Sequence, residues 1–315
     1  MNFIKPKIVV SKCLEFDACR YDGQLITNKY IKMLKEFIDF IPVCPEVEIG
    51  LGTPRDTIKV VNNKDGKILF QPSTNTDLTK KMKTFSDAFL SQLENVEGFI
   101  LKSKSPSCGL KSAKMYVSKN NSPSMGAGDG LFAEQVRNRF PDFPSEDEKR
   151  LNNVFIREHF YTTIFTIADF RGVDTMKKMY EYHSRHKYLF MSYNQALTIK
   201  MGRIAANSSG DKFEKVRAEY FQELLIMFKK RARYTSNINM LMHVMGYFKS
   251  DVTSNEKEHF LSLLETYRQK KIPLSALTSV LFSWATRFNN RYLLNQSLFS
   301  SFPMELMGQA KSRFL

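Results

Sequence analysis

The apolar and polar positions of the first 145 residues alternate between strand-length runs and helical stripes. Apolar runs of strand length occur at Lys7–Ser11, Phe40–Val43 and Glu97–Leu101. Apolar residues recur at i, i+3 and i+4 from about Thr27 to Ile38, and again from Thr76 to about Asn95. This spacing predicts an amphipathic helix after each of the first two strands, the second capped by Thr76.

The stretch between residues 55 and 72 predicts a β-hairpin, with Thr57–Val61 and Lys67–Phe70 on either side of a turn at Asn63–Gly66. A further helix is expected at Leu131–Arg139, after the glycine-rich segment Met125–Gly130. Apart from the hairpin, strands and helices alternate along this half. The order predicts an α/β fold with a parallel sheet and right-handed crossovers.

Pro141 and Pro144 mark the expected boundary between two domains, at residues 1–144 and 145–315. Ser145, with Glu148 three positions later, is a capping-box pattern that predicts the start of a helix. Beyond it nearly every stretch has helical spacing and proline is rare. We therefore expect an all-α second domain of about six to eight helices.

Positive charge is concentrated in the second half. Residues 1–150 carry 23 Lys+Arg against 19 Asp+Glu, a balance of +4, and residues 151–315 carry 24 against 13, a balance of +11. Basic and aromatic residues interleave there, at Lys177–Tyr188 and Lys229–Tyr234. Cations fit phosphates and aromatic faces stack on bases, so the balance favours RNA as a partner, although a solvated helix face explains any single cluster.

All four cysteines lie in the first half of the chain, at Cys13, Cys19, Cys44 and Cys108. Cys13, Cys44 and Cys108 each lie at or beyond the carboxyl end of a predicted strand. Parallel strands end at one edge of a sheet, where open α/β folds place their sites. We therefore expect these three thiols to converge in one crevice.

The residue types alone leave the metal open. The spacing Cys13-x5-Cys19 is longer than that of a zinc ribbon and differs from the compact cysteine run of a ferredoxin. Sulfur ligands from separate strands suit zinc or an iron–sulfur cluster. Lys102, Lys104 and Lys111 flank Cys108 and are expected to lower the pKa of its thiol; the alternative is a basic surface loop with an incidental cysteine.

A carboxylate accompanies the second thiol, because Glu46 follows Cys44 by two residues at the end of the second strand. In this position it can activate water or shuttle a proton; the alternative is a helix-capping or salt-bridged acid. Two further acids are expected to pair with neighbouring arginines: Asp22 with Arg20, and Asp56 with Arg55.

Three motifs in this order resemble the thiouracil desulfidase family over roughly residues 5–145. They are Val10-Ser-Lys-Cys13 with Arg20-Tyr-Asp-Gly23, Pro42-Val-Cys-Pro-Glu-Val47 with Gly50-Leu-Gly-Thr-Pro-Arg55, and Lys104-Ser-Pro-Ser-Cys-Gly109. The other half resembles a helical domain of long-uncharacterised type. The combination resembles the fused tRNA 4-thiouridine desulfidases.

The resemblance implies a [4Fe–4S] cluster held by Cys13, Cys44 and Cys108, with one iron open to bind substrate sulfur. Cys19 is then a thiol near the site that is not a ligand. The catalytic acid and hydroxyl of the family fall on Glu46 and Ser105, and Ser107 is an alternative for the hydroxyl.

The implied activity is redox-neutral removal of sulfur from 4-thiouridine in tRNA, which gives uridine and sulfide. The implied partner is tRNA; no membrane or obligate protein partner is expected. The chain has no apolar run of ~18 residues and no signal-peptide pattern, so a cytoplasmic protein is expected. One alternative is a desulfidase of free thiouracil or thionucleosides, against which the basic second half argues. Another is a non-enzymatic RNA-binding protein with a structural metal or a redox-sensing cluster, against which Glu46 argues.

Overall fold

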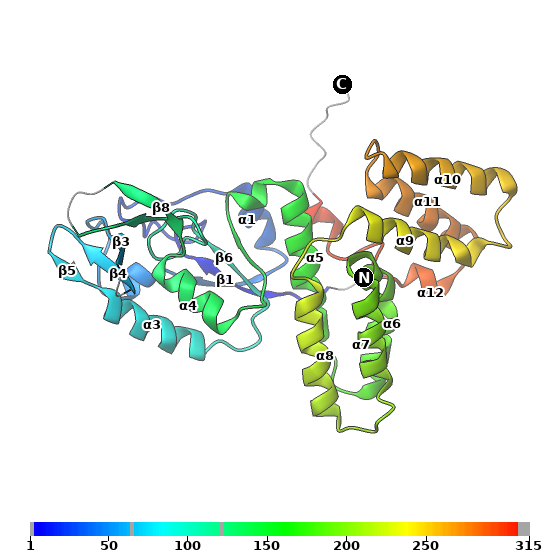
Figure 1. Cartoon of the computed structure of the whole chain (residues 1–315), viewed down its shortest axis with the longest axis horizontal. Coiled ribbons are helices and arrows are strands. Elements are labelled where there is room, and N and C mark those ends of the chain that lie inside the picture. The colour runs from blue at the N-terminus through cyan, green and yellow to red at the C-terminus, as the bar shows by residue number, and fades with distance from the viewer. Residues whose placement is uncertain (1–2, 64–65, 120–122, 308–315) are drawn as a thin grey trace. The chain divides into compact units, whose positions relative to one another are not determined.

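The chain forms two compact units, one rich in strands and one helical (Figure 1). The structure is a computed structural model and describes residues 3–63, 66–119 and 123–307. We call residues 4–168 the sheet unit and residues 169–304 the helical unit. The predicted combination of an α/β half and an all-α half is confirmed.

The parallel sheet of the sheet unit carries the three strands that precede the cysteines. Its strand order is β2–β1–β6–β9, and all neighbours are parallel. The strands are β1 (Lys7–Ser11), β2 (Asp39–Val43), β6 (Gly98–Leu101) and β9 (Ser145–Asp147). Ile8, Val9 and Val10 are fully buried, as expected for a strand inside a sheet that is covered on both faces.

A second, five-stranded sheet contains the predicted hairpin. Its order is β5–β4–β3–β7–β8, with β3 (Lys59–Asn63), β4 (Gly66–Gln71), β5 (Thr76–Asp77), β7 (Ala113–Tyr116) and β8 (Ser124–Gly128). Strands β3 and β4 pair antiparallel, as the hairpin prediction requires, and residues 64–65 of the predicted turn lie outside the described residues. The sequence did not predict β7 and β8, because their short or glycine-rich segments carry little apolar pattern.

Helices α3 (Thr79–Ser91) and α4 (Leu131–Arg139) lie side by side along the sheets (Figure 1). They pack through Phe85, Phe89 and Phe132, whose ring centroids lie 5.7–6.4 Å apart. The predicted cap at Thr76 is wrong, because Thr76 pairs with β4 as part of β5. Helix α1 (Lys29–Leu34) is shorter than predicted; it begins where the Asn28 side chain accepts hydrogen bonds from the next helical amides.

The helix predicted to start at Ser145 is absent. Residues Ser145–Asp147 instead form β9 beside β6, and Glu148 turns its carboxylate towards Lys102 and Ser103. A short 3-10 turn at Arg150–Asn152 and helix α2 (Pro45–Glu48) complete the small elements of this unit, and α5 (Val154–Phe170) follows. Because most of α5 also packs in the sheet unit, the two compact units divide after Ala168, whereas the sequence suggested Pro144.

The helical unit is built from helices joined by short loops. Its helices are α6 (Met176–Tyr193), α7 (Gln195–Ala206), α8 (Phe213–Met227), α9 (Tyr234–Met245), α10 (Ser254–Arg268), α11 (Leu274–Arg287) and α12 (Arg291–Leu294), with a 3-10 turn at Gly246–Phe248. A further 3-10 turn, Met304–Leu306, begins at the last residue of this unit. With α5 this gives eight α-helices in the described part after residue 153, which agrees with the predicted six to eight. Met240, Phe248, Phe260 and Trp284 are buried in one core.

A buried polar chain ties the end of the helical unit to α6. The Ser297 hydroxyl lies 2.7 Å from His186 Nδ1, and His186 Nε2 lies 2.8 Å from Asp169 Oδ2. His186 and Ser297 are less than 5% exposed, so a substrate cannot reach these side chains. The hydrogen-bonded group therefore has a structural role. Within the described residues, no helix is long and apolar enough to cross a bilayer.

Candidate active site

All four cysteines line one cavity of about 670 Å³ in the sheet unit. Cys13 lies two residues beyond β1, Cys44 follows β2 directly, and Cys108 lies in the loop that follows β6. These strands are parallel, so their carboxyl ends meet at the same edge of the sheet. The predicted convergence of Cys13, Cys44 and Cys108 is therefore what the structure shows, and Cys19 lines the cavity with them.

Backbone hydrogen bonds fix the loop that carries Cys108. The Ser105 hydroxyl oxygen accepts from the amides of Ser107 (3.1 Å) and Cys108 (3.0 Å). Gly130 packs so closely beneath the loop that a Cβ there would lie 2.6 Å from the carbonyl oxygens of Pro106 and Ser107. Only glycine allows this approach, so the start of α4 supports the thiol loop directly.

Glu148 holds the other end of the same loop. Its carboxylate accepts hydrogen bonds from the Ser103 amide (2.8 Å), the Ser103 hydroxyl (2.6 Å) and Lys102 Nζ (2.7 Å). Burial acts to raise the pKa of Glu148, but these hydrogen bonds and the Lys102 charge outweigh it and hold the pKa below its usual value. A charged Glu148 thus connects β9 to the loop after β6.

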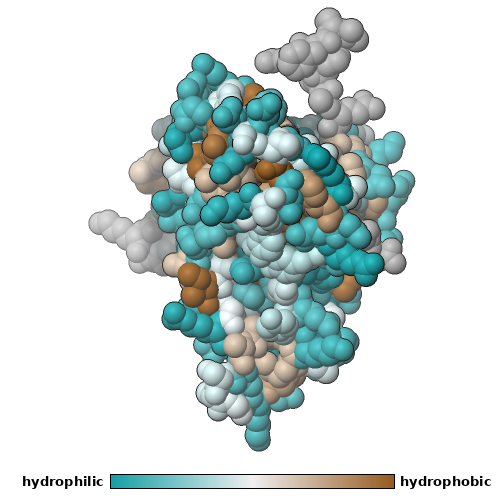
Figure 2. Space-filling view, turned by 90° about the vertical axis from the view of Figure 1, so that its right-hand side faces the viewer, coloured by the Kyte–Doolittle hydropathy of each residue, from teal (hydrophilic) through white to brown (hydrophobic). Residues whose placement is uncertain are grey.

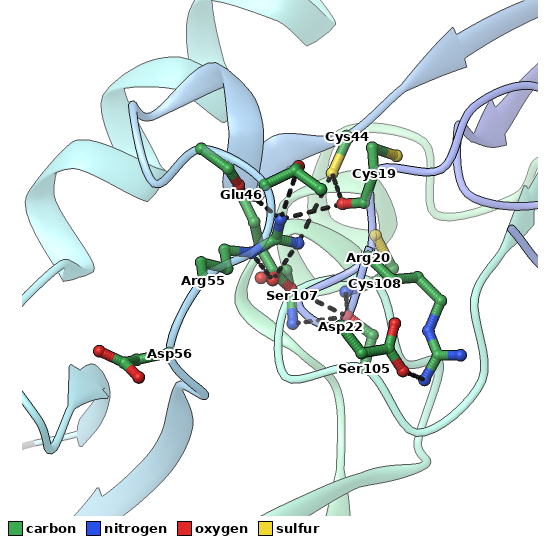
Figure 3. A network of polar contacts seen from close by, with 12 residues as sticks. Cys19, Arg20, Asp22, Cys44, Glu46, Arg55, Asp56, Ser105, Ser107 and Cys108 are labelled. Atoms are coloured by element: carbon green, nitrogen blue, oxygen red, sulfur yellow. Dashed lines mark hydrogen bonds and ion pairs between the residues drawn. The ribbon is translucent and has the colours of Figure 1, made fainter. Parts of the chain in front are cut away.

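Arg55 organises the polar side of the cavity (Figure 3). Its Nε and Nη2 atoms lie 2.9 and 2.7 Å from Glu46 Oε2, and its Nη1 donates to the carbonyl oxygen of Cys19 at 2.9 Å. The expected pairing of Arg55 with Asp56 is wrong, because the Asp56 side chain points away from this network. Asp22 does pair with Arg20, at 3.1 Å.

Ser105 is the serine that reaches Glu46. Its hydroxyl lies 3.4 Å from Glu46 Oε1, the carboxylate oxygen that Arg55 leaves uncovered. Ser107 is fully buried, and its hydroxyl has no hydrogen-bond partner among the described residues. The geometry therefore brings Glu46, Ser105 and Arg55 together at the thiols and leaves Ser107 outside the group.

The thiols are buried, and burial controls their acidity. It raises the pKa of Cys108 well above its usual value and, together with the nearby Cys44, raises the pKa of Cys13 to about 12. The expectation that the flanking lysines lower the pKa of Cys108 is wrong: Lys102 binds Glu148, and burial dominates. Cys44 differs, because a hydrogen bond from Cys19 lowers its pKa to about 7 against the effect of burial.

Comparison with known proteins gives the same assignment as the motifs. A family model described as 2-thiouracil desulfurase matches residues 8–148, and one described as protein of unknown function DUF1722 matches residues 187–303. The uncharacterized protein YbbK of Bacillus subtilis (strain 168) is 30% identical over 110 residues, which cover 32% of this chain and 72% of YbbK. The chain belongs to the 2-thiouracil desulfurase family.

Two further proteins resemble this member of the 2-thiouracil desulfurase family. The uncharacterized protein YbgA of Escherichia coli (strain K12) is 26% identical over 130 residues, or 41% of this chain and 77% of YbgA. A solved structure of the [4Fe-4S]-dependent thiouracil desulfidase TudS is 28% identical and covers 47% of this chain and 94% of its own, with a TM-score of 0.37.

The donor set of this desulfurase-family site consists of sulfur atoms, which suit zinc or a metal–sulfur cluster. A zinc ion would draw its thiolates to within ~2.3 Å of one point. Among the described residues, no three His, Cys, Asp or Glu side chains are placed to hold one metal ion. The thiols of Cys13, Cys44 and Cys108 line one cavity, and their shared burial means that thiolates there require positive charge.

Two residues of the site were missed by sequence reasoning. Arg55 was assigned to Asp56 because the two are adjacent, and Glu148 was interpreted as part of a helix cap. Their partners lie 36 and 45 positions away, at Cys19 and Ser103. A buried acid immediately after a short edge strand is the pattern that could have indicated Glu148.

Proposed function

We propose that the protein is a [4Fe–4S]-dependent desulfidase that removes sulfur from 4-thiouridine in tRNA. The observation that carries the proposal is the placement of Glu46, Ser105 and Arg55 beside the thiols of Cys13, Cys44 and Cys108 in one cavity. A purely structural metal site needs no acid and hydroxyl at its edge. Membership of the 2-thiouracil desulfurase family supports a thionucleobase as the substrate class.

Cys13, Cys44 and Cys108 are the proposed cluster ligands, and Cys19 is the proposed non-ligand. When bound, a cluster with three cysteine ligands supplies one iron that can bind a thiocarbonyl sulfur and draw electrons from the ring carbon. The net reaction is hydrolysis: a C=S group and water give a C=O group and hydrogen sulfide. No external oxidant or reductant is consumed.

Glu46 is placed to take the proton of the attacking water. Arg55 occupies Oε2 of the carboxylate, which leaves Oε1 facing Ser105 and the cavity. Ser105 can then hold the base or relay the proton, since its hydroxyl oxygen already accepts two backbone amides and its hydrogen is directed at Glu46.

The charge around the cavity supports a substrate with phosphates over a free base. Four lining cations form ion pairs with acids: Lys12 with Asp17, Arg20 with Asp22, Arg55 with Glu46 and Lys102 with Glu148. The other lining cations are Lys59, Lys104 and Lys114. Lys104 and Lys114 are exposed, and Tyr21 and Tyr116 at the same rim offer aromatic faces to a base. A neutral thiouracil requires none of this charge.

The helical unit supports a polynucleotide substrate in the same way. Residues 169–304 carry 21 Lys+Arg against 11 Asp+Glu, a balance of +10. A single nucleotide is too small to use a basic domain of this size, whereas tRNA presents phosphates over its whole surface. Because bases stack inside folded RNA, the thiolated base has to leave its stack to enter the cavity.

An anaerobic assay tests the proposal. The protein is reconstituted with iron and sulfide, and loss of thiocarbonyl absorbance is followed with 4-thiouridine-containing tRNA, free 4-thiouridine and thiouracil in parallel. Cluster-dependent loss with tRNA is expected. Loss with the free compounds alone would overturn the tRNA assignment, and no loss with any of them, at full cluster loading, would overturn the enzymatic assignment.

A further inference from the structure

Two basic segments that are far apart in the sequence meet on the helical unit. One is the α8–α9 connection with Lys229, Lys230, Arg231 and Arg233, and the other is the end of α10 with Arg268, Lys270 and Lys271. The ammonium group of Lys270 lies over the ring of Tyr234, 5.3 Å from its centroid. We call these seven cations and Tyr234 the α8–α10 basic surface.

Hydrogen bonds behind this surface hold its two parts together. The Asn237 amide donates to the Tyr267 hydroxyl at 2.9 Å, so α9 and α10 are joined directly beneath the cations. The Lys270 and Lys271 amides donate to the carbonyl oxygens of Tyr267 (2.7 Å) and Thr266 (3.1 Å). Lys270 adopts a φ of 59°, a conformation that glycine usually takes at a helix end. The end of α10 therefore presents two lysines on a fixed turn.

The surface is strongly and almost uniformly positive. All seven cations and Tyr234 are exposed. Glu265, which pairs with Arg268 at 3.0 Å, is the one acid within the two segments, so seven positive charges and one negative leave +6. Helix α9, which begins directly after the first segment, contains no acid. Like charges held this close repel one another, and a polyanion removes that repulsion.

The chemistry of the surface favours RNA over a protein partner. Phosphates spaced along a backbone match several exposed cations, and Tyr234, 44% exposed, offers a face for a base or ribose. The face drawn in Figure 2 is mostly hydrophilic, and its apolar residues form small separate patches. The α8–α10 basic surface itself offers a protein partner one large side chain with apolar area, Tyr234, whereas charge recognition needs none.

We propose that the α8–α10 basic surface binds the phosphate backbone of the substrate tRNA. This inference rests on the proposed function and deepens it, because it names where the helical unit grips RNA. Each lost phosphate contact lowers the slope of log Kd against log salt by about one unit. The surface should therefore account for a large part of the salt dependence of tRNA binding.

The test compares two fourfold variants of the full chain. The first carries Lys230→Gln, Arg231→Gln, Lys270→Gln and Lys271→Gln. The control removes the same charge from exposed lysines elsewhere on the helical unit, with Lys200→Gln, Lys212→Gln, Lys249→Gln and Lys257→Gln. Binding is measured with tRNA that lacks 4-thiouridine, from low to high salt, so that the result does not depend on desulfidation. Turnover of free 4-thiouridine checks the catalytic cavity separately.

The first variant is expected to bind tRNA on the order of 10–100-fold more weakly at physiological salt, with a salt slope lower by about 3–4 units. The control variant should lose much less tRNA affinity, and its salt slope should change much less. Equal loss in the two variants would overturn the proposal, as would binding of the parent to phosphatidylserine vesicles but not to tRNA. If tRNA binding depends on the surface but no thionucleobase is turned over, the proposed tRNA-binding role of the surface is supported and the proposed enzymatic function is overturned.

Discussion

Arg55 holds Glu46 by one carboxylate oxygen only. Both Nε and Nη2 of Arg55 contact Oε2, at 2.9 and 2.7 Å, and Oε1 faces the Ser105 hydroxyl at 3.4 Å. Arg55 thus fixes Oε2 of the carboxylate, and Oε1 is left to act as the proposed base. Since Arg55 also binds the Cys19 carbonyl oxygen, it sets the acid in position relative to the thiol loops.

We predict that Arg55→Lys lowers kcat about 10–100-fold while iron content and KM change little. Lysine keeps the charge but cannot make the two hydrogen bonds from Nε and Nη2 that converge on Oε2 and orient the carboxylate. Steady-state kinetics and iron analysis of the reconstituted protein measure this. Arg20→Lys is the matched control, because Arg20 lines the same cavity but pairs with Asp22. A variant that lost iron together with activity would show that Arg55 is structural instead.

Substitutions of Glu46 and Cys108 should distinguish a loss of catalysis from a loss of cofactor binding. Glu46→Gln should keep a full iron complement and lower kcat by at least about 10²-fold, the usual contribution of a general base. Cys108→Ala should lose the iron itself, because a thiolate is replaced by a methyl group. Visible absorbance and iron content before any assay distinguish the two outcomes. Normal turnover of Glu46→Gln would remove this residue from the mechanism.

Glu148→Gln should loosen the Cys108 loop in a pH-dependent way. The pKa of Glu148 is lowered in the folded protein, so its charged form stabilises the fold above the usual glutamate pKa of ~4.3. At pH 7 we expect a loss of about 2 kcal/mol, typical of hydrogen bonds to a charged group. The difference should shrink as the pH falls from the usual glutamate pKa through the lower pKa of the folded state, where the native carboxylate also becomes protonated.

Hydrogen exchange at the Ser103 amide is the suitable measurement for Glu148→Gln, because that amide donates to the carboxylate. The chain has a single tryptophan, Trp284, and it lies in the helical unit, so its fluorescence does not report on this loop. Glu146→Gln is the control: it pairs with Arg150, whose side chain is 57% exposed, so solvent screens the pair and it should contribute less than about 1 kcal/mol. A difference for Glu148→Gln that stays constant down to pH 3 would contradict the linkage.

Gly130→Ala should destabilise the thiol loop by about 1–3 kcal/mol and reduce iron loading. The new methyl group would lie 2.6 Å from the carbonyl oxygens of Pro106 and Ser107, so backbone next to Cys108 has to move. Gly246→Ala is the control, because a Cβ there meets no atom within 4 Å. Thermal unfolding and iron content after reconstitution test the pair. Full loading of Gly130→Ala would show that the loop tolerates the shift.

The sequence predicted the parts of the site that depend on strand order. Strands β1, β2 and β6 are apolar runs with little polar interruption, so the edge where Cys13 and Cys44 emerge followed from the pattern. Cys108 followed in the same way, because its loop begins where β6 ends. The roles of Cys13, Cys44, Cys108, Glu46 and Ser105 came from the family resemblance, and they stay predictions.

The sequence did not predict contacts between residues that lie far apart along the chain. The pattern Ser145 to Glu148 satisfies the rule for a helix cap, and the sheet overrides it because β6 offers an unpaired edge that Ser145–Asp147 can complete. Arg55 pairs with Glu46 and not with the adjacent Asp56, because a buried carboxylate is stabilised more by a charged partner than an exposed carboxylate is. Neither choice is visible from neighbours along the chain.

The position of β9 has a consequence for how the protein matures. Synthesis proceeds from the N-terminus, so the edge strand of the parallel sheet leaves the ribosome after every other strand of that sheet. Until it emerges, β6 has an open edge, and Ser103 lacks the carboxylate of Glu148. About a hundred further residues are therefore translated after Cys13 and Cys44 before β9 can complete the sheet. The loop that carries Cys108 therefore has all of its hydrogen bonds only after Glu148 has been synthesised.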